Sequence, residues 1–320
     1  MQSFRAKEFL PSALIQRVTE LRVSDPERSF GLAQKRSRRA QLTVDGKLNI
    51  LAADHPARRV VAVGTEPLGM ADRHDYLARI VRVLEEDSVD GLMATMDILE
   101  DLLVLDEIRA EAGHRPLLDN KLLIASLNRG GLLNVSWEMD DPMTGASAAT
   151  VAAWNFDGAK VLLRICDDER DSLKTIMATT QVINEMNSLR LPLFLEPLPA
   201  MKTDRGYKII RTAEALASIV SVATALGDSS RHLWLKLPYC ENYEVVAGAT
   251  TLPILLLGGE SAGNPGQFIR ELNAGLAAGA NVRGVMVGRN VLYPGNADPG
   301  EVAAEVGRLV HNRGAIETVA

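Results

Sequence analysis

A single lysine interrupts the apolar segment RHLWLKLPY at residues 231–239. The leucines alternate along this segment, which predicts a strand with Trp234 and Lys236 on the face opposite the leucines. Pro238 ends the strand, so Lys236 lies near its carboxyl end. Burial lowers the pKa of a lysine from about 10.4 by up to a few units, and a neutral amine attacks carbonyl carbons to form a Schiff base. The segment also fits a lysine that extends into solvent from an edge strand, so both interpretations stay open at this point.

Two carboxylates follow apolar segments in a similar way. Asp54 follows the run LNILAA, and Glu196 follows LFL and immediately precedes Pro197. A carboxyl group removed from water has a raised pKa, and it can exchange protons with a substrate near neutral pH. Other interpretations are that Asp54 caps a helix or joins a salt bridge, and that Glu196 forms a structural ion pair with Lys160 or Arg164.

Two further cations belong to the segment AKVLLRI at residues 159–165, where Lys160, Leu162 and Arg164 share one face of a predicted strand. The interior of an α/β barrel holds mainly branched apolar side chains, so two inward cations predict an anionic ligand or carboxylate partners. The alternative is that both side chains face loops at the strand ends. Lys160 lies about four residues, roughly 13 Å, before Arg164, so the two cations are expected at different depths.

The elements that must position these residues are eight predicted strands that alternate with helices. Strands are expected at 48–53, 91–95, 121–126, 159–165, 193–196, 231–237, 253–257 and 282–287, and helices at 72–86, 97–112, 169–188, 212–226, 265–279 and 299–312. This alternation predicts a (β/α)₈ TIM barrel, an α/β fold whose active sites lie at the carboxyl ends of the strands. An open doubly wound sheet would carry a glycine fingerprint after its first strand, where this chain has ADHP instead.

The predicted barrel is a single domain over residues 1–320 with two additions. Residues 1–45 are expected to form a helical N-terminal extension, whose basic run KRSRR at residues 35–39 is interpreted as a solvated helix face, with an anion site as the alternative. Residues 127–157 connect the third and fourth strands, and a connection this long is often a lid or an interface.

Glycine-containing turns follow the last two predicted strands. Gly258, Gly259 and Glu260 follow the seventh strand, and Gly288 and Arg289 follow the eighth. Phosphate sites of α/β barrels are commonly built at these two strand ends, because glycines let backbone N–H groups approach the phosphate. An arginine adds a charged donor. These turns predict a phosphorylated substrate.

Composition excludes several classes of function. The net charge of −6 provides no basic surface for nucleic acid or for an anionic membrane, and no uninterrupted apolar run is long enough to span a bilayer. The five histidines are scattered and the cysteines, Cys166 and Cys240, lack metal spacing, so we expect neither a metal nor an organic cofactor. The charged start MQSFRAKEFLPSALI predicts no signal peptide, and reduced thiols then indicate a cytoplasmic protein.

Taken together, these segments resemble the class I, Schiff-base aldolases of the deoxyribose-phosphate and tagatose-bisphosphate aldolase superfamily over about residues 45–310. The resemblance rests on AADH, GAKVLLR, PLFLEPL and LWLKLPY at the first, fourth, fifth and sixth strands, and on LLGGE and VMVGRN at the last two. It implies Lys236 as the Schiff-base lysine, Asp54 and Glu196 as acid–base groups and Lys160 as a further catalytic residue. The residues expected to contact the substrate or its phosphate are Gly258, Gly259, Gly288, Arg289, Arg164 and His55.

The tagatose-bisphosphate branch is the closer of the two, but the chain departs from each branch at one strand. The deoxyribose-phosphate branch has a second lysine on the seventh strand, where this chain reads PILLL. The tagatose-bisphosphate branch has a tyrosine at the end of the fourth strand, where this chain reads RIC. The implied reaction is reversible cleavage of a phosphorylated ketose that releases dihydroxyacetone phosphate. Hexulose bisphosphates and an inositol-derived keto-deoxygluconate phosphate are candidate substrates by the same resemblance. A phosphosugar isomerase or epimerase and a non-catalytic sugar-phosphate sensor are the alternatives, and a homo-oligomer is expected.

Overall fold

The computed structural model of the chain describes residues 4–204, 206–259, 263 and 265–311. Glu260 of the predicted glycine turn and residue 312 of the predicted last helix lie outside the described residues. The strands are β1 Leu48–Ala53, β2 Gly91–Ala94, β3 Leu122–Ser126, β4 Gly158–Ile165, β5 Leu193–Thr203, β6 Gly206–Ile209, β7 Leu233–Pro238, β8 Ile254–Leu257 and β9 Val282–Val287. The helices are α1 Ala6–Phe9, α2 Ser12–Ser24, α3 Arg28–Lys35, α4 Arg73–Leu84, α5 Met96–Glu111, α6 Ala148–Ala153, α7 Asp171–Leu189, α8 Ala213–Thr224, α9 Tyr243–Gly248, α10 Pro265–Ala277, α11 Arg289–Leu292 and α12 Pro299–His311.

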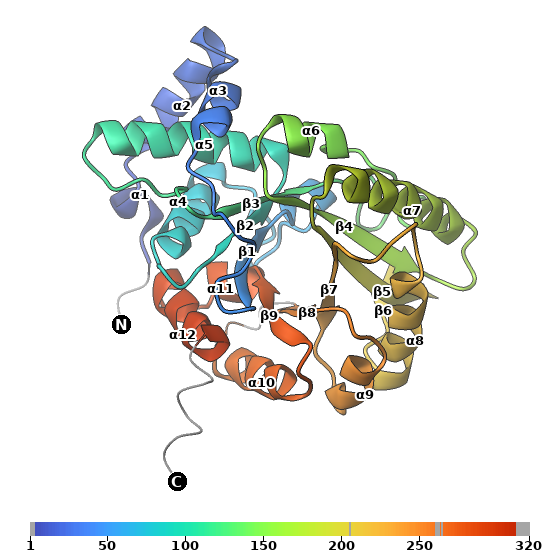
Figure 1. Ribbon diagram of the computed structural model, residues 1–320. Coiled ribbons are helices and arrows are strands. Elements are labelled where there is room, and N and C mark those ends of the chain that lie inside the picture. Colours follow the sequence, from blue (N-terminus) through green and yellow to red (C-terminus); the bar gives the residue numbers. More distant parts are fainter. Residues whose placement is uncertain (1–3, 205, 260–262, 264, 312–320) are drawn as a thin grey trace.

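Eight parallel strands close into a barrel, which confirms the predicted fold. The strand order is β4-β3-β2-β1-β9-β8-β7-β5, and a further pairing of β4 with β5 closes the ring. Helices surround this ring, and α2 and α3 project beyond α5 (Figure 1). Because parallel strands run in one direction, the carboxyl ends of all eight meet at the same mouth of the barrel.

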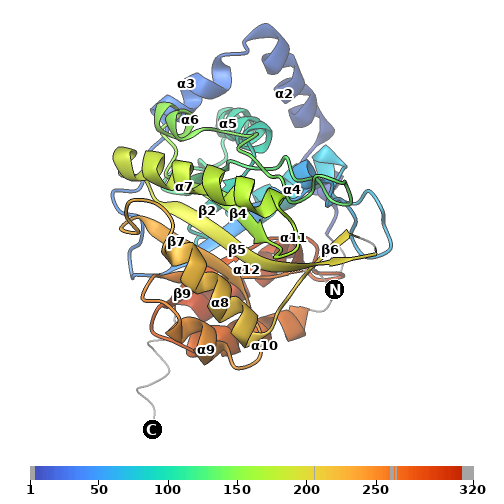
Figure 2. The same ribbon diagram turned by 90° about the vertical axis from the view of Figure 1, so that its right-hand side faces the viewer.

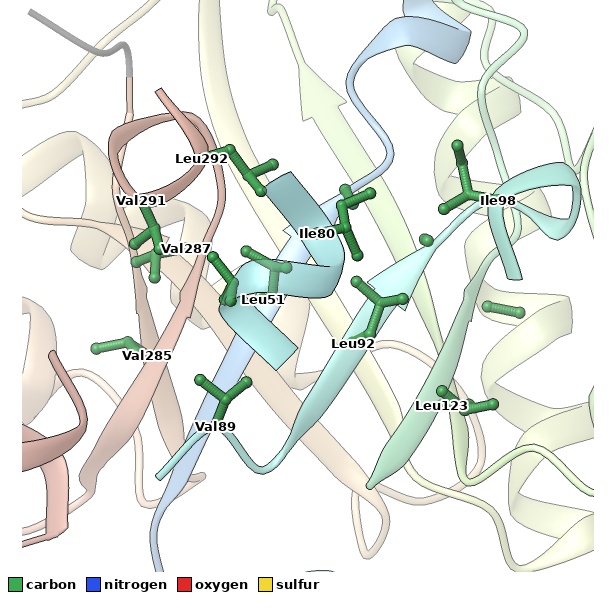
Figure 3. Close-up of a cluster of buried hydrophobic side chains, with 14 of the residues drawn as sticks. Leu51, Ile80, Val89, Leu92, Ile98, Leu123, Val285, Val287, Val291 and Leu292 are labelled. Atoms are coloured by element: carbon green, nitrogen blue, oxygen red, sulfur yellow. The ribbon is translucent and has the colours of Figure 1, made fainter. Parts of the chain in front are cut away.

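The outer face of the strands is covered by helices, and this layer forms the larger part of the core. Leu51 of β1, Leu92 of β2 and Val287 of β9 pack toward Ile80 of α4 and Leu292 of α11 (Figure 3). β1, β2 and β3 are buried along their whole length. Because both faces of such strands are covered, their sequences are almost continuously apolar. Within the described ranges, no helix combines the length and the apolar character needed to cross a membrane.

Short polar side chains mark where several helices begin. Asp72 accepts hydrogen bonds from the backbone N–H groups of His74 and Asp75 at the start of α4. Ser147 caps α6 and Thr212 caps α8 in the same way. Each cap satisfies backbone donors that have no partner within the helix, so the sequence itself sets these boundaries.

The interior of the barrel changes from apolar to polar along the strands. Leu48, Ile50, Ile124, Phe194 and Met286 belong to a second buried cluster that fills the lower interior. Since side chains of a strand alternate between faces, the residue two positions after Phe194 also points inward, and that residue is Glu196. Trp234 packs against the same interior cluster, and Lys236 follows it by the same spacing.

The N-terminal helices pack on α5 through arginine–carboxylate pairs. Arg22 Nε donates to Asp101 Oδ1 at 2.8 Å, and the Arg28 guanidinium donates to Glu107 Oε1 at 2.6 Å. The Arg22 and Arg28 side chains are 39% and 42% exposed, so each pair contributes about 1 kcal/mol or less to the free energy of unfolding. α2 and α3 therefore join the barrel mainly along α5, while α1 packs on α4 and Phe30 of α3 contacts Trp154 at the end of α6.

The interpretation of the basic run as a solvated helix face is wrong. α3 ends at Lys35, and the arginines that follow pair with carboxylates at the amino ends of the strands. Arg36 and Arg38 contact Asp157 at 2.7 and 2.9 Å, and Arg39 contacts Asp90 at 2.7 Å. The Arg36 and Arg39 side chains are only 3% and 10% exposed, so buried pairing with carboxylates explains these two arginines.

The fifth strand is longer than predicted, because Glu196 does not end it. β5 continues through Pro197 and Pro199 to Thr203 and then pairs with β6 as an antiparallel hairpin. β5 pairs with β7 only from Leu193 to Leu195, so beyond that point the edge facing β7 needs no backbone donor and tolerates proline. Figure 2 shows this hairpin reaching past the barrel at the side of α7 and α8.

Candidate active site

Five charged side chains form a continuous row across the interior at the carboxyl ends of the strands. In order they are Arg129, Asp54, Lys160, Glu196 and Lys236, and we call them the ionic row. Lys236 Nζ lies 3.0 Å and Lys160 Nζ 2.7 Å from the same oxygen, Glu196 Oε2. Lys160 Nζ also lies 3.4 Å from Asp54 Oδ2, and the Arg129 guanidinium contacts that same Asp54 oxygen. Each carboxylate therefore serves two cations.

Strand alternation brings the row together. Lys160 lies on β4, Glu196 on β5 and Lys236 on β7, and each occupies an inward position above the apolar interior. Asp54 directly follows β1, and its Oδ2 accepts a hydrogen bond of 3.0 Å from the hydroxyl of Ser126 at the end of β3. The different depths expected on β4 are real, but the lysine side chain is long enough to reach the carboxylates above it.

Asn128 fixes the start of the loop that delivers Arg129. Its amide nitrogen donates to the Leu162 carbonyl at 2.6 Å, and its amide oxygen accepts from the Leu162 N–H at 2.8 Å. The side chain thereby continues the β3–β4 pairing beyond the last residue of β3. Arg129 follows directly, and the hydroxyl of Thr144 accepts a 3.1 Å hydrogen bond from its backbone N–H.

Burial and mutual contact control the charges of the row. Exposed fractions are 0% for Lys160, 1% for Asp54, 4% for Lys236 and 9% for Glu196. Burial lowers the pKa of Lys236 and, well below its ordinary value, the pKa of Lys160. Burial alone would raise the pKa of Glu196, but the adjacent Lys160 and Lys236 outweigh it and lower that pKa. Glu196 is therefore an ionised acceptor between two amines that lose protons easily.

The two predicted glycine turns lie side by side at the mouth. β8 pairs with β9, and the Asn290 side chain donates to the Gly258 carbonyl at 2.5 Å. Gly259 has φ +67°, a conformation that favours glycine. A Cβ on Gly288 would lie 2.3 Å from the Ala52 carbonyl oxygen, so close packing of β9 on β1 requires this glycine.

His55 and Arg289 both adjoin Gly288, in the turn after β9. A Cβ on Gly288 would also approach the His55 ring to 2.5 Å. Burial and the positive charges of Arg289 and Lys236 lower the pKa of His55 well below its ordinary value, so the imidazole is neutral. Within the described part of the chain, His55 Nδ1 has no hydrogen-bond partner. Arg289 begins α11 directly after Gly288.

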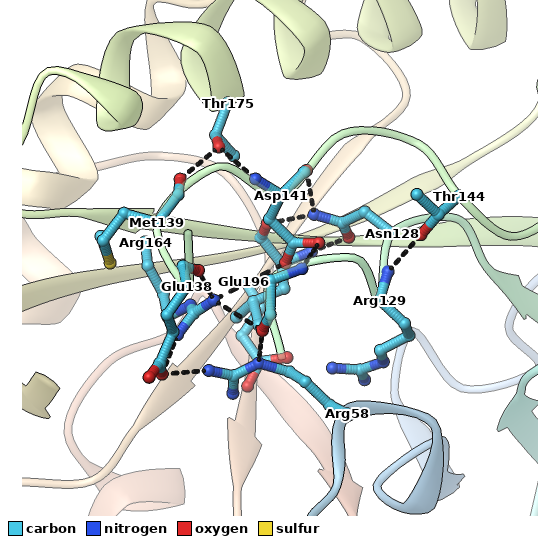
Figure 4. Close-up of polar contacts among 12 residues, drawn as sticks. Arg58, Asn128, Arg129, Glu138, Met139, Asp141, Thr144, Arg164, Thr175 and Glu196 are labelled. Carbon is cyan, nitrogen blue, oxygen red and sulfur yellow. Dashed lines mark hydrogen bonds and ion pairs between the residues drawn. The ribbon is translucent and has the colours of Figure 1, made fainter. Parts of the chain in front are cut away.

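Arg164 belongs to a second cluster, above the ionic row. Its guanidinium donates to Glu138 Oε1 at 2.5 Å and to the Gly131 carbonyl at 3.1 Å, and Arg58 donates to the same Glu138 oxygen at 2.8 Å (Figure 4). Asp141 accepts from the Gly131 N–H at 2.9 Å. These contacts fasten residues 131–141 of the long connection over the mouth of the barrel. The predicted contact of Arg164 with substrate stays a prediction.

Ser126 and Arg129 were not among the predicted site residues. Ser126 ends the predicted third strand, and alternation from Leu122 and Ile124 already places it inward. Arg129 lies in the long connection, which has no periodicity from which its direction follows. Only the interpretation of residues 127–157 as a lid or an interface indicated that residues of this connection approach the mouth of the barrel.

Metal ligands do not gather among the residues that the structure covers, where no group of three or more histidine, cysteine, aspartate or glutamate side chains could hold an ion. Cys166 and Cys240 are both buried and unpaired. The charged groups that do converge are amines, a guanidinium and carboxylates, and this set is suited to carbonyl and proton-transfer chemistry.

Comparison with known proteins shows the family of this chain. A family model described as Cgl0159-like matches residues 46–308. The crystal structure of Cgl0159 from Corynebacterium glutamicum superimposes with a TM-score of 0.87 and is 35% identical, over 94% of this chain and 97% of that chain.

Two more distant proteins share the fold or part of the sequence. The crystal structure of an archaeal fructose 1,6-bisphosphate aldolase has a TM-score of 0.60 and 20% identity, covering 89% of this chain and 99% of that one. The enzyme 2-amino-3,7-dideoxy-D-threo-hept-6-ulosonate synthase 1 of Archaeoglobus fulgidus is 24% identical over 91% of this chain and 96% of its own length.

Proposed function

The chain belongs to the Cgl0159-like family, and we propose that it is a class I aldolase that cleaves or forms a carbon–carbon bond in a phosphorylated ketose. The observation that carries the proposal is the pair of buried amines, Lys236 and Lys160, on one oxygen of Glu196. A relative that is a hept-6-ulosonate synthase and the barrel shared with a fructose 1,6-bisphosphate aldolase support it. Among the aldolases, we propose that this chain is nearest to the tagatose-bisphosphate branch.

Lys236 is the nucleophile of this reaction. Its neutral amine attacks the ketone carbon of the substrate, and the carbonyl oxygen takes up a proton to give a carbinolamine. Loss of this hydroxyl as water leaves an iminium ion on Lys236. Glu196 lies within hydrogen-bond distance of both the Lys160 and the Lys236 amines, so Glu196 and Lys160 can carry the protons of these steps.

Cleavage then uses the iminium as an electron sink. Glu196 or Asp54 takes the proton of the substrate hydroxyl, the carbon–carbon bond breaks, and its electron pair moves into the iminium to form an enamine. The aldehyde departs, the enamine is protonated on carbon, and water releases the ketone, dihydroxyacetone phosphate in our proposal. Glu196 contacts Lys236 directly and Asp54 does not, so we assign the first proton transfer to Glu196.

The phosphate of the substrate is proposed to bind at the turns of β8 and β9. Gly258, Gly259 and Gly288 provide backbone without side chains there, and Arg289 provides positive charge. The neutral His55 adjoins Gly288 and is near enough to Arg289 and Lys236 for their charges to lower its pKa, so we assign its ring a hydrogen bond to a substrate oxygen. A cytoplasmic location and a homo-oligomeric assembly remain predictions from sequence.

Borohydride reduction tests the proposal. The protein is incubated with a panel of ketose phosphates, including dihydroxyacetone phosphate, reduced with borohydride and weighed intact by mass spectrometry. An aldolase of this class gains the mass of the reduced ketose. A protein that interconverts phosphosugars without gaining mass is instead the isomerase or epimerase that the same carboxylates and phosphate site would allow.

A further inference from the structure

Arg129 is a buried cation for which the proposed reaction has no step. Its side chain is only 11% exposed, and its guanidinium contacts Asp54. Its Nε has no hydrogen-bond partner among the described residues. Burying a guanidinium costs free energy unless a carboxylate compensates it, so the pairing with Asp54 is a defining feature of the site.

The ionic row contains one more cation than it has carboxylates. Among the described residues, Asp54 and Glu196 are the carboxylates in direct contact with Arg129, Lys160 and Lys236, while the charge of Asp141 acts on Arg129 without a direct ion pair. A buried excess of positive charge is costly. Arginine keeps its proton under all physiological conditions, whereas a buried lysine releases its proton readily. The excess is therefore removed from one of the two lysines.

The contacts show how Arg129 causes this excess. Asp54 Oδ2 already receives Arg129 and the Ser126 hydroxyl, and Lys160 is farther from it, at 3.4 Å, than from Glu196 Oε2, at 2.7 Å. Lys160 therefore shares Glu196 with Lys236. Without Arg129, Asp54 would be free to take Lys160 as a full ion pair, and Lys236 would hold Glu196 alone.

We propose that Arg129 is a positioning residue that occupies Asp54. Lys160 and Lys236 are thereby left with one carboxylate, Glu196, and together carry one positive charge. The inference rests on the proposed Schiff-base function, because a neutral amine is the form of lysine that attacks the ketone. The shared Glu196 oxygen lies between the two amines and gives the proton a route from Lys236 to Lys160.

Other charged groups facing the two amines leave this balance intact. His55 is neutral, and Arg289 is a further cation that also lowers the pKa of Lys236. Asp54 and Glu196 are the carboxylates in contact with the row among the described residues. A neutral side chain at position 129 should therefore let both lysines stay protonated at neutral pH.

The experiment is an NMR titration of the whole protein with isotopically labelled lysine, in which Lys160→Met and Lys236→Met assign the two signals. In the unmodified protein one of the two amines should lose its proton at least about two pH units below the usual 10.4. Arg129→Met should raise that midpoint by at least about one pH unit. Arg129→Gln, whose amide still hydrogen-bonds Asp54, should raise it equally.

Two further variants separate charge from structure. Arg129→Met combined with Asp54→Asn again leaves two lysines on one carboxylate, so the low midpoint should return. Arg58→Met removes a cation that contacts Glu138 and acts on Glu196 only through space, so it should raise the midpoint by clearly less than Arg129→Met does. A midpoint that Arg129→Met and Arg129→Gln leave in place, that the double variant does not restore, or that Arg58→Met raises by as much as Arg129→Met would overturn the inference.

Trapping of dihydroxyacetone phosphate with cyanoborohydride links the charge balance to function. Its rate against pH should shift upward in Arg129→Met by the same amount as the NMR midpoint. If the midpoints behave as expected and the unmodified protein traps no ketose phosphate, the charge balance is supported and the proposed aldolase is wrong. If trapping occurs with the same pH profile in both proteins, the aldolase is supported and the role of Arg129 is wrong.

Discussion

The two ends of the barrel both bury charged side chains, but they match the charges differently. At the amino ends of the strands, Asp157 pairs with Arg36 and Arg38 at 2.7 and 2.9 Å, and Asp90 pairs with Arg39 at 2.7 Å. These cations are arginines, which never give up their protons. At the carboxyl ends, two lysines share one carboxylate oxygen, and lysines exchange protons. The first arrangement suits stability and the second suits chemistry, in line with the division between the two faces of such barrels.

The two ends of the barrel also differ in the surroundings of a buried lysine, Lys121 at one end and Lys236 at the other. Burial lowers the pKa of Lys121, at the amino end of β3, to about 8. Its Nζ donates to the backbone carbonyls of Glu86 and Val89, the first at 2.9 Å. Lys236 instead faces a carboxylate that can exchange protons with it. A lowered pKa alone therefore does not identify a catalytic lysine. The acceptor beside the amine must also be able to exchange a proton with it.

The largest expected effect is that of Lys236→Ala. Without the nucleophile the covalent route is closed, so kcat/KM should fall by more than about 10⁴-fold while circular dichroism stays unchanged. Lys121→Met is the matched control at the opposite end, and its kcat/KM should remain within about twofold of the unmodified protein. Substantial cleavage by Lys236→Ala, or a collapse of activity in the control alone, would reverse the assignment of the two ends.

Glu196→Gln should lower kcat by roughly 10²–10⁴-fold, because the amide keeps the shape of the side chain but cannot take the proton. Imine formation should continue slowly. Single-turnover borohydride trapping beside steady-state cleavage separates the two steps. Normal cleavage would transfer the acid–base role to Asp54 and leave Glu196 as an ion-pair partner.

Asp157→Asn should have the opposite profile, with a loss of stability and no loss of chemistry. The change leaves the buried Arg36 without its carboxylate, which should lower the free energy of unfolding by about 3–5 kcal/mol. The kcat of the remaining folded protein should not change. Denaturant titration and activity at 25 °C provide both numbers, and an unchanged unfolding curve would show that the arginine pairs contribute little.

Arg289→Ala should raise KM for a phosphorylated ketose by about tenfold and change kcat by less than about threefold, as expected when ground-state binding is lost. The matched measurement uses the dephosphorylated ketose, whose KM should stay the same. Equal changes for both substrates would remove the phosphate site from the turns of β8 and β9.

His311 should produce the smallest effect, and only over part of the pH range. Hydrogen bonds to Asp90 and Asp45 raise its pKa above the ordinary value of about 6.5, despite partial burial. Since the folded pKa is the higher one, the pairs stabilise the protein fully below about pH 6.5, and this contribution disappears as the pH rises through the folded pKa. His311→Gln should therefore cost up to about 1 kcal/mol at pH 6 and less at pH 9. An equal cost at both pH values would show that the charge is not involved.

The sequence was sufficient to predict the barrel because each strand is an apolar run whose ends are marked by polar or glycine residues. The same alternation put Lys236 on the strand face opposite the leucines, and the apolar runs put Asp54 and Glu196 at the carboxyl ends. Alternation does not report what a long loop contacts, so Arg129 was missed and the partners of Arg164 were not foreseen. The predicted fifth strand stops at Glu196, before Pro197, because the sequence does not show that β5 loses its neighbour β7 on one edge at that point.

The location of a reduced adduct tests the central claim most directly, that the carboxyl end of the barrel holds the nucleophile. The protein is reduced with borohydride in the presence of dihydroxyacetone phosphate, digested and sequenced by tandem mass spectrometry. The account predicts a modification on Lys236, with Lys160 and Lys121 unmodified. An adduct on Lys160 or Lys121 with Lys236 intact, or no adduct with any ketose phosphate that the protein converts, would contradict it.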